Sequence, residues 1–404
     1  MDVVPYCCAC GAEQSAERLT CFACSGPLDF RYDRPLEADP RFTRSMWKYW
    51  RRLPIASPDD IVTLAEGATP LLESRVAVGH VWLKDETRNP TGSHKDRALA
   101  VALTHAKAIG RRASVVVSAG STGISNAAAS ARAGLRSVVV VGRGVPDERI
   151  YPAFALGAAI VEVDAEIDLV IERVAELGAG GRIYVSSTAR TSNPYQAEGP
   201  KTIAYEIVEE LGEAPEWVVV PVGGGGTVAG IWRGFLDLHA AGRIRQLPRL
   251  LGVVAAGYDA IARAFREPGR EPDEIYPLDH VAPPTILAKI AHVFPPDGSE
   301  ALDALRRSAG GSVVVTEYDA IAAQRQIGRD EGLYVEPSSA AAIAGLERAR
   351  RDGLIDDGDR VVVILSGSGF RESFASASWR PLERITAGLA GMTELLVALD
   401  AAVS

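Results

Sequence analysis

The chain has 404 residues, 47% of them hydrophobic and 24% charged, which are the proportions of a soluble globular protein rather than of a disordered chain. At ~100–200 residues per domain, this length predicts two or three domains. The net charge of −9 argues against a nucleic-acid-binding surface, and no apolar run reaches the ~18 residues that a membrane span requires. Because the N-terminus has neither the basic nor the apolar part of a secretion signal, we expect a cytoplasmic protein.

All five cysteines lie before residue 25, and four of them form two Cys-x-x-Cys pairs separated by ten residues. Two such pairs, each on a tight turn, aim four thiolates at one tetrahedral ion. We therefore predict a closed, structural zinc site formed by Cys7, Cys10, Cys21 and Cys24. Disulfides and a site that has lost its metal are the alternatives, and Cys8 is interpreted as a small apolar filler. Loss of this ribbon is expected to reduce stability or assembly before it affects catalysis.

A helix is expected at residues 46–52, where aromatic and basic residues would tie the ribbon to the rest of the chain. From residue 60 onward, Val- and Ile-rich runs alternate with alanine-rich helical stretches. Apolar runs without polar alternation indicate strands buried on both faces, hence mainly parallel sheets covered by helices. The chain is therefore predicted to be an α/β protein with enough strands for two sheets, at 114–117, 137–141, 159–163, 183–186, 217–222, 250–254 and 360–365. The amphipathic stretch 382–403 is expected to form a packing or dimer helix.

Four glycines and a threonine follow the expected strand 217–222 and precede a helix. Backbone N–H groups in such a loop converge on an anion, and the helix N-terminus adds partial positive charge. The loop is predicted to bind a phosphate through Gly223, Gly224, Gly225, Gly226 and Thr227. The alternatives are a dinucleotide-binding turn, which belongs at the first βα turn of a domain rather than past mid-chain, and a glycine-rich turn without a ligand.

Lys95 is one of only six lysines, and it lies in a Thr-Gly-Ser-His-Lys turn that opens a helix. The helix dipole and the nearby Arg97 are expected to lower the pKa of Lys95, as an amine that forms Schiff bases requires. Asp96 is interpreted as a salt-bridge partner, and His94 as a packed, hydrogen-bonded residue. A solvated surface lysine is the alternative for Lys95.

Two further strand ends carry glycine and hydroxyl residues. Ser118, Ser121 and Thr122 lie at the start of a helix, where hydroxyls and free N–H groups suit a carboxylate. Ser366 follows the last predicted strand, and its hydroxyl would meet a neutral ring nitrogen. A phosphate loop, an activated lysine, a carboxylate loop and such a hydroxyl are together what a pyridoxal-phosphate enzyme acting on amino acids requires.

The motifs resemble those of fold-type-II pyridoxal-phosphate enzymes, and most of all those of the threonine synthase family. The matching segments run in family order over nearly the whole chain, at 64–71, 89–97, 118–134, 193–202, 223–227 and 331–340. The resemblance implies two open, mostly parallel sheets flanked by helices, a small N-terminal zinc ribbon and a homodimer. It further implies three parts, namely the ribbon at 1–35, a large cofactor-binding domain at 36–101 and 202–404, and a small mobile domain at 102–201 that closes on the substrate carboxylate.

The resemblance also implies a role for each loop. Lys95 would form the Schiff base with pyridoxal 5'-phosphate and move protons at Cα, and residues 223–227 would hold the cofactor phosphate. Ser118, Ser121 and Thr122 would bind the substrate carboxylate or the cofactor hydroxyl. Ser366 would face the pyridine nitrogen, and a neutral hydroxyl there leaves the ring unprotonated, which suits β- or γ-elimination and replacement.

Three departures from the family pattern bear on the substrate. Ser121 stands where the family usually has Asn, and His94 stands where it usually has Phe. The stretch 142–151 lacks two lysines and a glutamine that help to bind the substrate phosphate in threonine synthases. Arg143 and Arg149 are the candidates to replace those lysines, although an arginine is not an equivalent point charge.

The expected activity is therefore that of a pyridoxal-phosphate-dependent carbon–oxygen lyase resembling threonine synthase. Its substrate would be O-phosphohomoserine or a related activated amino acid from which phosphate leaves. One alternative is β-replacement or β-elimination on O-phosphoserine, serine or threonine, as in cysteate synthase or threonine dehydratase. The other is a catalytically idle relative that serves as a binding protein.

Overall fold

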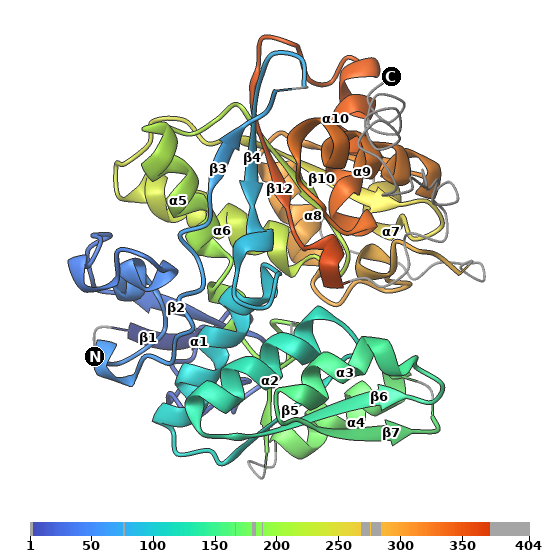
Figure 1. The fold of residues 1–404 in the computed structure, drawn as a ribbon. Coiled ribbons are helices and arrows are strands. Elements are labelled where there is room, and N and C mark those ends of the chain that lie inside the picture. The colour runs from blue at the N-terminus through green and yellow to red at the C-terminus, as the bar shows by residue number, and fades with distance from the viewer. Residues whose placement is uncertain are drawn as a thin grey trace, which may run out of the picture. The chain divides into compact units, whose positions relative to one another are not determined.

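The computed structural model describes residues 3–75, 77–165, 167–179, 183–187, 189–267, 275 and 284–371. These residues form three sheets (Figure 1). The smallest is an antiparallel pair of β1 (Val3–Cys7) with β2 (Leu28–Tyr32). Cys7 ends β1, and the other four cysteines lie between the two strands. The other two have the strand orders β11-β10-β9-β12-β4-β3 and β7-β6-β5-β8. The predicted fold class is confirmed.

The six-stranded sheet is parallel except at its edge strand β3, which runs antiparallel to β4. Its strands are β3 (Leu71–Glu73), β4 (His80–Asp85), β9 (Trp217–Pro221), β10 (Arg249–Ala255), β11 (Gly311–Val315) and β12 (Arg360–Leu365). Every residue of β9 is buried. Because side chains alternate along a strand, Val218 and Val220 enter one hydrophobic cluster while Trp217 and Val219 enter another.

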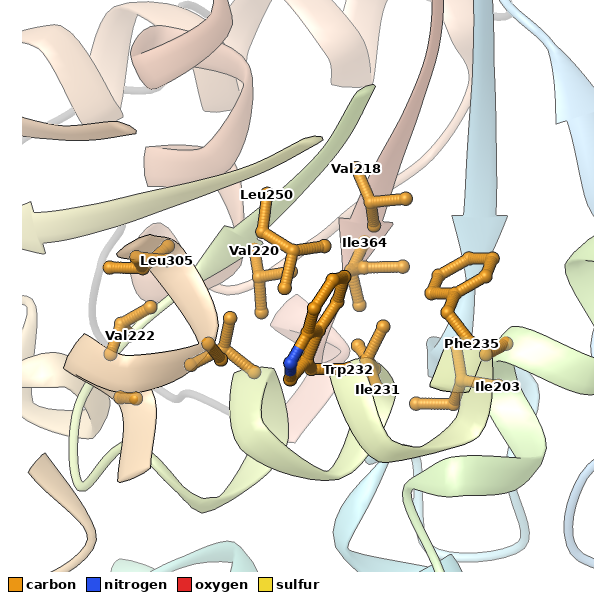
Figure 2. Close-up of a cluster of buried hydrophobic side chains, with 14 of the residues drawn as sticks. Ile203, Val218, Val220, Val222, Ile231, Trp232, Phe235, Leu250, Leu305 and Ile364 are labelled. Carbon is orange, nitrogen blue, oxygen red and sulfur yellow. The ribbon is translucent and has the colours of Figure 1, made fainter. Parts of the chain in front are cut away.

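Helices cover both faces of this sheet. The first cluster contains residues of α5 (Lys201–Leu211), α6 (Gly226–Ala240), α7 (Ala260–Arg266) and α8 (Gly298–Arg307). In Figure 2, Trp232 and Phe235 of α6 lie against side chains of β9 and β12, and burial of aromatic rings of this size contributes much of the core stability. The second cluster contains residues of α9 (Glu317–Glu331) and α10 (Pro337–Arg351).

The four-stranded sheet is parallel throughout. Its strands are β5 (Ala113–Val117), β6 (Arg136–Gly142), β7 (Ala159–Val163) and β8 (Tyr184–Val185), and its helices are α1 (Lys95–Ala108), α2 (Ser121–Ala133), α3 (Asp147–Ala155) and α4 (Ile167–Ala179). Helix α2 ends at Gly134, whose φ of 74° is the left-handed conformation that glycine adopts without strain. No helix among the described residues has both the length and the apolar character needed to cross a membrane.

All seven strands expected from the sequence are present, and β1, β2, β3, β4 and β11 were not predicted. The helix expected at 46–52 is the 3₁₀ helix Met46–Arg52, and its Met46, Trp47 and Trp50 pack in one cluster with Phe30 of β2, as predicted for a tie between ribbon and body. The stretch 382–403 lies outside the described residues.

A buried ion network joins β4, α1 and α5. The Arg97 guanidinium donates to both Glu86 and Glu206, at 2.7 Å to each, and it has no solvent exposure. Lys84 of β4 adds a second cation, 3.0 Å from Glu206. Although burial alone would raise the pKa of Glu206, the charges of Arg97 and Lys84 hold it well below its usual range. The network therefore fixes the first turn of α1 to the six-stranded sheet and to α5.

Replacement of Arg97 by methionine is expected to lower the free energy of unfolding by about 3–5 kcal/mol, because it leaves the buried Glu86 without its ion-pair partner and Glu206 with Lys84 alone. Denaturant unfolding of the purified variant measures the change. Arg348→Met is the matched control, since Arg348 lies half exposed in an ion pair with Asp352 and should cost no more than about 1 kcal/mol. Equal effects of the two substitutions would contradict the role given to the network.

Candidate active site

Lys95 is the first residue of α1, at the end of a turn held by hydrogen bonds within itself. The backbone N–H and the hydroxyl of Thr91 both donate to the Asp96 carboxylate, at 2.7 Å each. Asp96 was expected to form a salt bridge, and that expectation is wrong for the described residues, because its oxygens accept these two donors instead. The turn thereby presents Lys95 at a fixed place on the helix.

Burial lowers the pKa of Lys95, and the positive charge of Lys289 lowers it further, while Asp297 and Glu336 act in the opposite direction. The lowered pKa was predicted, but its largest cause is burial, and Arg97 is not among the charges that act on Lys95. Arg97 was expected to depress the pKa, yet its charge is committed to Glu86 and Glu206. A lysine in this state keeps a larger share of neutral, nucleophilic amine near pH 7 than an exposed lysine does.

The glycine loop 223–227 connects β9 to α6, which begins at Gly226. Gly225 has a φ of 98°, and a Cβ on it would lie 2.4 Å from the backbone oxygen of Asp297. A Cβ on Gly223 would lie 2.6 Å from the backbone oxygen of Lys289. These glycines are therefore required by the close approach of segment 289–297, in addition to any anion that their N–H groups bind.

His94 links the glycine loop to the end of β12. Its Nδ1 lies 2.9 Å from the carbonyl oxygen of Ser366, and its Nε2 lies 3.1 Å from the hydroxyl of Thr227. Burial, and then the charge of Lys95, lower the pKa of His94 to about 3, so the ring is neutral. Because a carbonyl oxygen only accepts, Nδ1 carries the proton and Nε2 accepts from Thr227. His94 is thus the hydrogen-bonded residue that the sequence predicted.

The carboxylate loop, residues 118–122, was predicted to bind the substrate carboxylate and lies at the junction of β5 and α2. The Ser118 hydroxyl accepts from the backbone N–H of Gly120 at 3.2 Å, and Ser121 and Thr122 are the first two residues of α2. Two cations reach the Ser121 hydroxyl, namely Lys289 through Nζ at 3.4 Å and Arg371 through Nη1 at 3.1 Å. The structure thus joins the carboxylate loop to groups that come from the six-stranded part of the chain.

Four charged residues of this site were not predicted, namely Lys289, Asp297, Glu336 and Arg371. Glu336 is almost fully buried and lies 3.2 Å from Lys289 Nζ. Burial, and then the charge of Glu300, raise the pKa of Asp297 to about 7. Only the scarcity of lysine marked Lys289 in the sequence, while Glu336 falls inside one of the quoted family segments.

The two arginines proposed for the substrate phosphate have other surroundings. Arg143 is 68% exposed and forms an ion pair with Asp164 at 2.6 Å. Arg149 is exposed on α3. No described contact joins either side chain to Lys95, to the glycine loop or to Ser121. Their role in substrate binding stays a prediction.

The four cysteines of the two pairs converge as predicted, with their Sγ atoms all within 4.8 Å of one another. Neighbouring sulfurs lie 3.5–3.6 Å apart. A disulfide requires about 2.05 Å, whereas a tetrahedral ion with Zn–S bonds of about 2.3 Å requires roughly 3.8 Å between sulfurs. The spacing therefore fits four thiolates around one ion. Cys8 is exposed rather than a buried filler, so that interpretation was wrong.

Arg190 connects the ribbon to the glycine loop. Its guanidinium contacts Cys8 Sγ at 3.2 Å, Asp29 at 3.1 Å and Glu300 at 2.5 Å. Its backbone N–H donates to the Asp297 carboxylate at 2.8 Å, and the N–H of Asp297 donates to the carbonyl of Gly224. Two residues, Arg190 and Asp297, therefore connect the ribbon by direct contacts to the loop predicted to bind phosphate.

Known proteins are similar to this chain in sequence and in fold. Residues 62–367 match the family described as pyridoxal-phosphate dependent enzyme. The chain is 34% identical to the threonine synthase of Methanocaldococcus jannaschii, over 93% of this chain and 95% of the relative. It is 35% identical to the threonine synthase of Mycobacterium tuberculosis strain H37Rv, over 82% of this chain and 91% of the relative.

Two solved structures show the same fold at lower identity. The processed form of threonine deaminase isoform 2 from Solanum lycopersicum has a TM-score of 0.64 at 21% identity, covering 85% of this chain and 94% of its own. Serine racemase from Dictyostelium discoideum has a TM-score of 0.62 at 22% identity, covering 74% and 92%. The chain therefore belongs to the fold-type-II family of pyridoxal-phosphate dependent enzymes, with the threonine synthases among its relatives.

Proposed function

We propose that this chain is a pyridoxal-phosphate-dependent carbon–oxygen lyase that acts on a phosphorylated amino acid, as threonine synthase does. The observation that carries the proposal is the meeting of three separate segments at His94, which directly precedes Lys95 and contacts both Thr227 and Ser366. The sequence relatives include threonine synthases that are 33–35% identical over 82–93% of this chain, and they support the reaction class.

The residues present fit the cofactor. The glycine loop, at a helix N-terminus, offers N–H groups to its phosphate, and Lys95 offers an amine of lowered pKa. When bound, pyridoxal phosphate supplies the electron sink that stabilises negative charge at the substrate Cα. Lys95 would then hold or deliver the proton at that carbon, and the Ser366 hydroxyl would face the ring nitrogen. Ser118, Ser121 and Thr122 orient the substrate through its carboxylate.

One observation favours a second candidate function, the β-replacement or β-elimination of O-phosphoserine, serine or threonine. The two arginines expected to replace the phosphate-binding lysines are exposed, and Arg143 is paired with Asp164. Separate incubations with O-phosphohomoserine and O-phosphoserine, with phosphate release and amino-acid product measured, distinguish the two reactions. Threonine from O-phosphohomoserine supports the first, and turnover of O-phosphoserine alone supports the second.

We also propose the domain division and the homodimer implied by the resemblance. The division is supported by the sheets, because the two-stranded one falls in 1–35, the four-stranded one in 102–201, and the six-stranded one in 36–101 together with 202–404. A cytoplasmic location and the dimer follow from analogy with relatives, and analytical ultracentrifugation of the purified protein tests the dimer.

Lys95→Ala should abolish the visible absorption band of the bound cofactor and lower kcat by more than about 10²-fold, because no other group would attach the cofactor and move the proton. Absorption spectra and steady-state kinetics measure the two effects. Lys107→Ala, at an exposed position near the end of the same helix, is the control and should match the wild type. A wild-type protein that stays colourless with added cofactor would refute the proposal.

Asp297 should make cofactor binding depend on pH. Its pKa of about 7 means that the carboxyl is neutral below pH 7 and ionised above it, where it would repel the phosphate of the cofactor. We expect the affinity for pyridoxal phosphate to fall roughly fivefold or more between pH 6.5 and 8.5. Asp297→Asn keeps the acceptor for Arg190 and should remove this fall. The same pH profile in both proteins would show that another group is responsible.

We propose that Cys7, Cys10, Cys21 and Cys24 bind one structural Zn²⁺, supported by the spacing of their sulfurs. Elemental analysis should find one zinc per chain, and Cys21→Ser should lose the metal and lower the melting temperature. Cys8→Ser is the control and should retain both, because Cys8 is not among the four converging thiols. Zinc retained in full by Cys21→Ser would contradict this ligand set.

A further inference from the structure

Two cationic side chains from segments far apart in the sequence meet at the start of α2. Lys289 belongs to the 3₁₀ helix Ala288–Ile290, and Arg371 to the 3₁₀ helix Gly369–Arg371. Lys289 Nζ lies 3.4 Å and Arg371 Nη1 lies 3.1 Å from the same oxygen, the hydroxyl of Ser121. Neither residue was assigned a role by the sequence motifs.

Both cations are anchored beside the groups proposed to do the chemistry. The backbone oxygen of Lys289 lies against Gly223, and the Cε of the same lysine would be 3.6 Å from a Cβ on Gly120. The side chain of Lys289 therefore runs from the glycine loop to the carboxylate loop. The Cδ of Arg371 would be 2.8 Å from a Cβ on Gly92, three residues before Lys95. Lys289 also acts on the pKa of Lys95. The two cations therefore lie beside the residues proposed to bind the cofactor and the substrate.

The charges around Ser121 suit a second anion. Lys289 lies 3.2 Å from Glu336, Arg371 acts on the nearby Asp96 carboxyl, and both cations reach the hydroxyl oxygen of Ser121. A phosphorylated amino acid carries two separate anionic groups. The hydroxyls and N–H groups of residues 118–122 supply donors for one of them, and a phosphate is bound well by a lysine together with an arginine.

We propose that Lys289 and Arg371 bind the side-chain phosphate of the substrate, while residues 118–122 bind its α-carboxylate. This inference rests on the proposed function and makes it more specific, because it assigns a substrate with a second anionic group remote from Cα. It gives to Lys289 and Arg371 the role that the sequence had suggested for Arg143 and Arg149.

The test compares two ligands that differ only in the phosphate. The visible band of the holoenzyme is titrated with O-phosphohomoserine and with homoserine, in the wild type, Lys289→Met and Arg371→Met. Loss of a charge-assisted hydrogen bond should weaken O-phosphohomoserine roughly 10- to 100-fold and leave homoserine within about twofold of wild type. Lys289→Arg should recover part of the affinity, and Lys107→Met, which removes an exposed lysine, should change neither ligand.

Three results of these ligand titrations would overturn the inference. Equal weakening of both ligands would place the cations on the α-carboxylate, and loss of the cofactor band in either variant would place them on the cofactor. Selectively weaker binding of O-phosphohomoserine to Arg143→Met or Arg149→Met, with Lys289→Met unchanged, would restore the earlier assignment.

Inorganic phosphate, titrated against the holoenzyme, tests the subsite without turnover. If phosphate shifts the visible band of the wild type but not that of Lys289→Met, the subsite stands even where the proposed reaction fails. If phosphate does not shift the band of the wild type, the subsite is refuted.

Discussion

Burying the Arg97 guanidinium away from water costs several kcal/mol of solvation free energy, which only its contacts with Glu86, Glu206 and nearby hydroxyls offset. Breaking these contacts would strongly lower the free energy of unfolding, so the first turn of α1 has one position relative to β4 and α5. Lys95 lies two residues before Arg97 on that turn. The placement of the proposed catalytic amine therefore depends on an ion network that itself takes no part in the chemistry.

A second constraint acts on the glycine loop. Segment 289–297 packs so closely against Gly223 and Gly225 that no side chain fits at either position. The same segment carries Lys289 toward the carboxylate loop and Asp297 toward Arg190. One stretch of backbone thus sets the shape of the proposed phosphate loop, supplies a cation for the substrate and meets the residue that contacts the ribbon. This is why the ribbon, although outside the site, is connected to it.

The sequence predicted those features that a pattern of consecutive residues determines. Seven strands were found because each is a short, mostly apolar run that contains Val or Ile, whereas β4 was missed because Lys84 and Asp85 interrupt its apolar character although both are buried. The lysine turn and the glycine loop were recognisable because their chemistry lies in consecutive residues. Lys289 and Arg371 were missed because their function depends on tertiary contacts with Ser121. Arg97 was misread for the same reason, since Glu206 lies more than 100 residues away in the sequence.

The account depends most on Lys95 as the point of cofactor attachment. Reduction of the holoenzyme with borohydride, followed by peptide mass spectrometry, fixes the cofactor to whichever amine holds it. The chain has only six lysines, of which Lys84 and Lys201 are buried in ion pairs, and Lys289 is the other lysine beside the site. The account predicts a phosphopyridoxyl group on Lys95 alone. The same group on Lys289, or on no lysine, would contradict it.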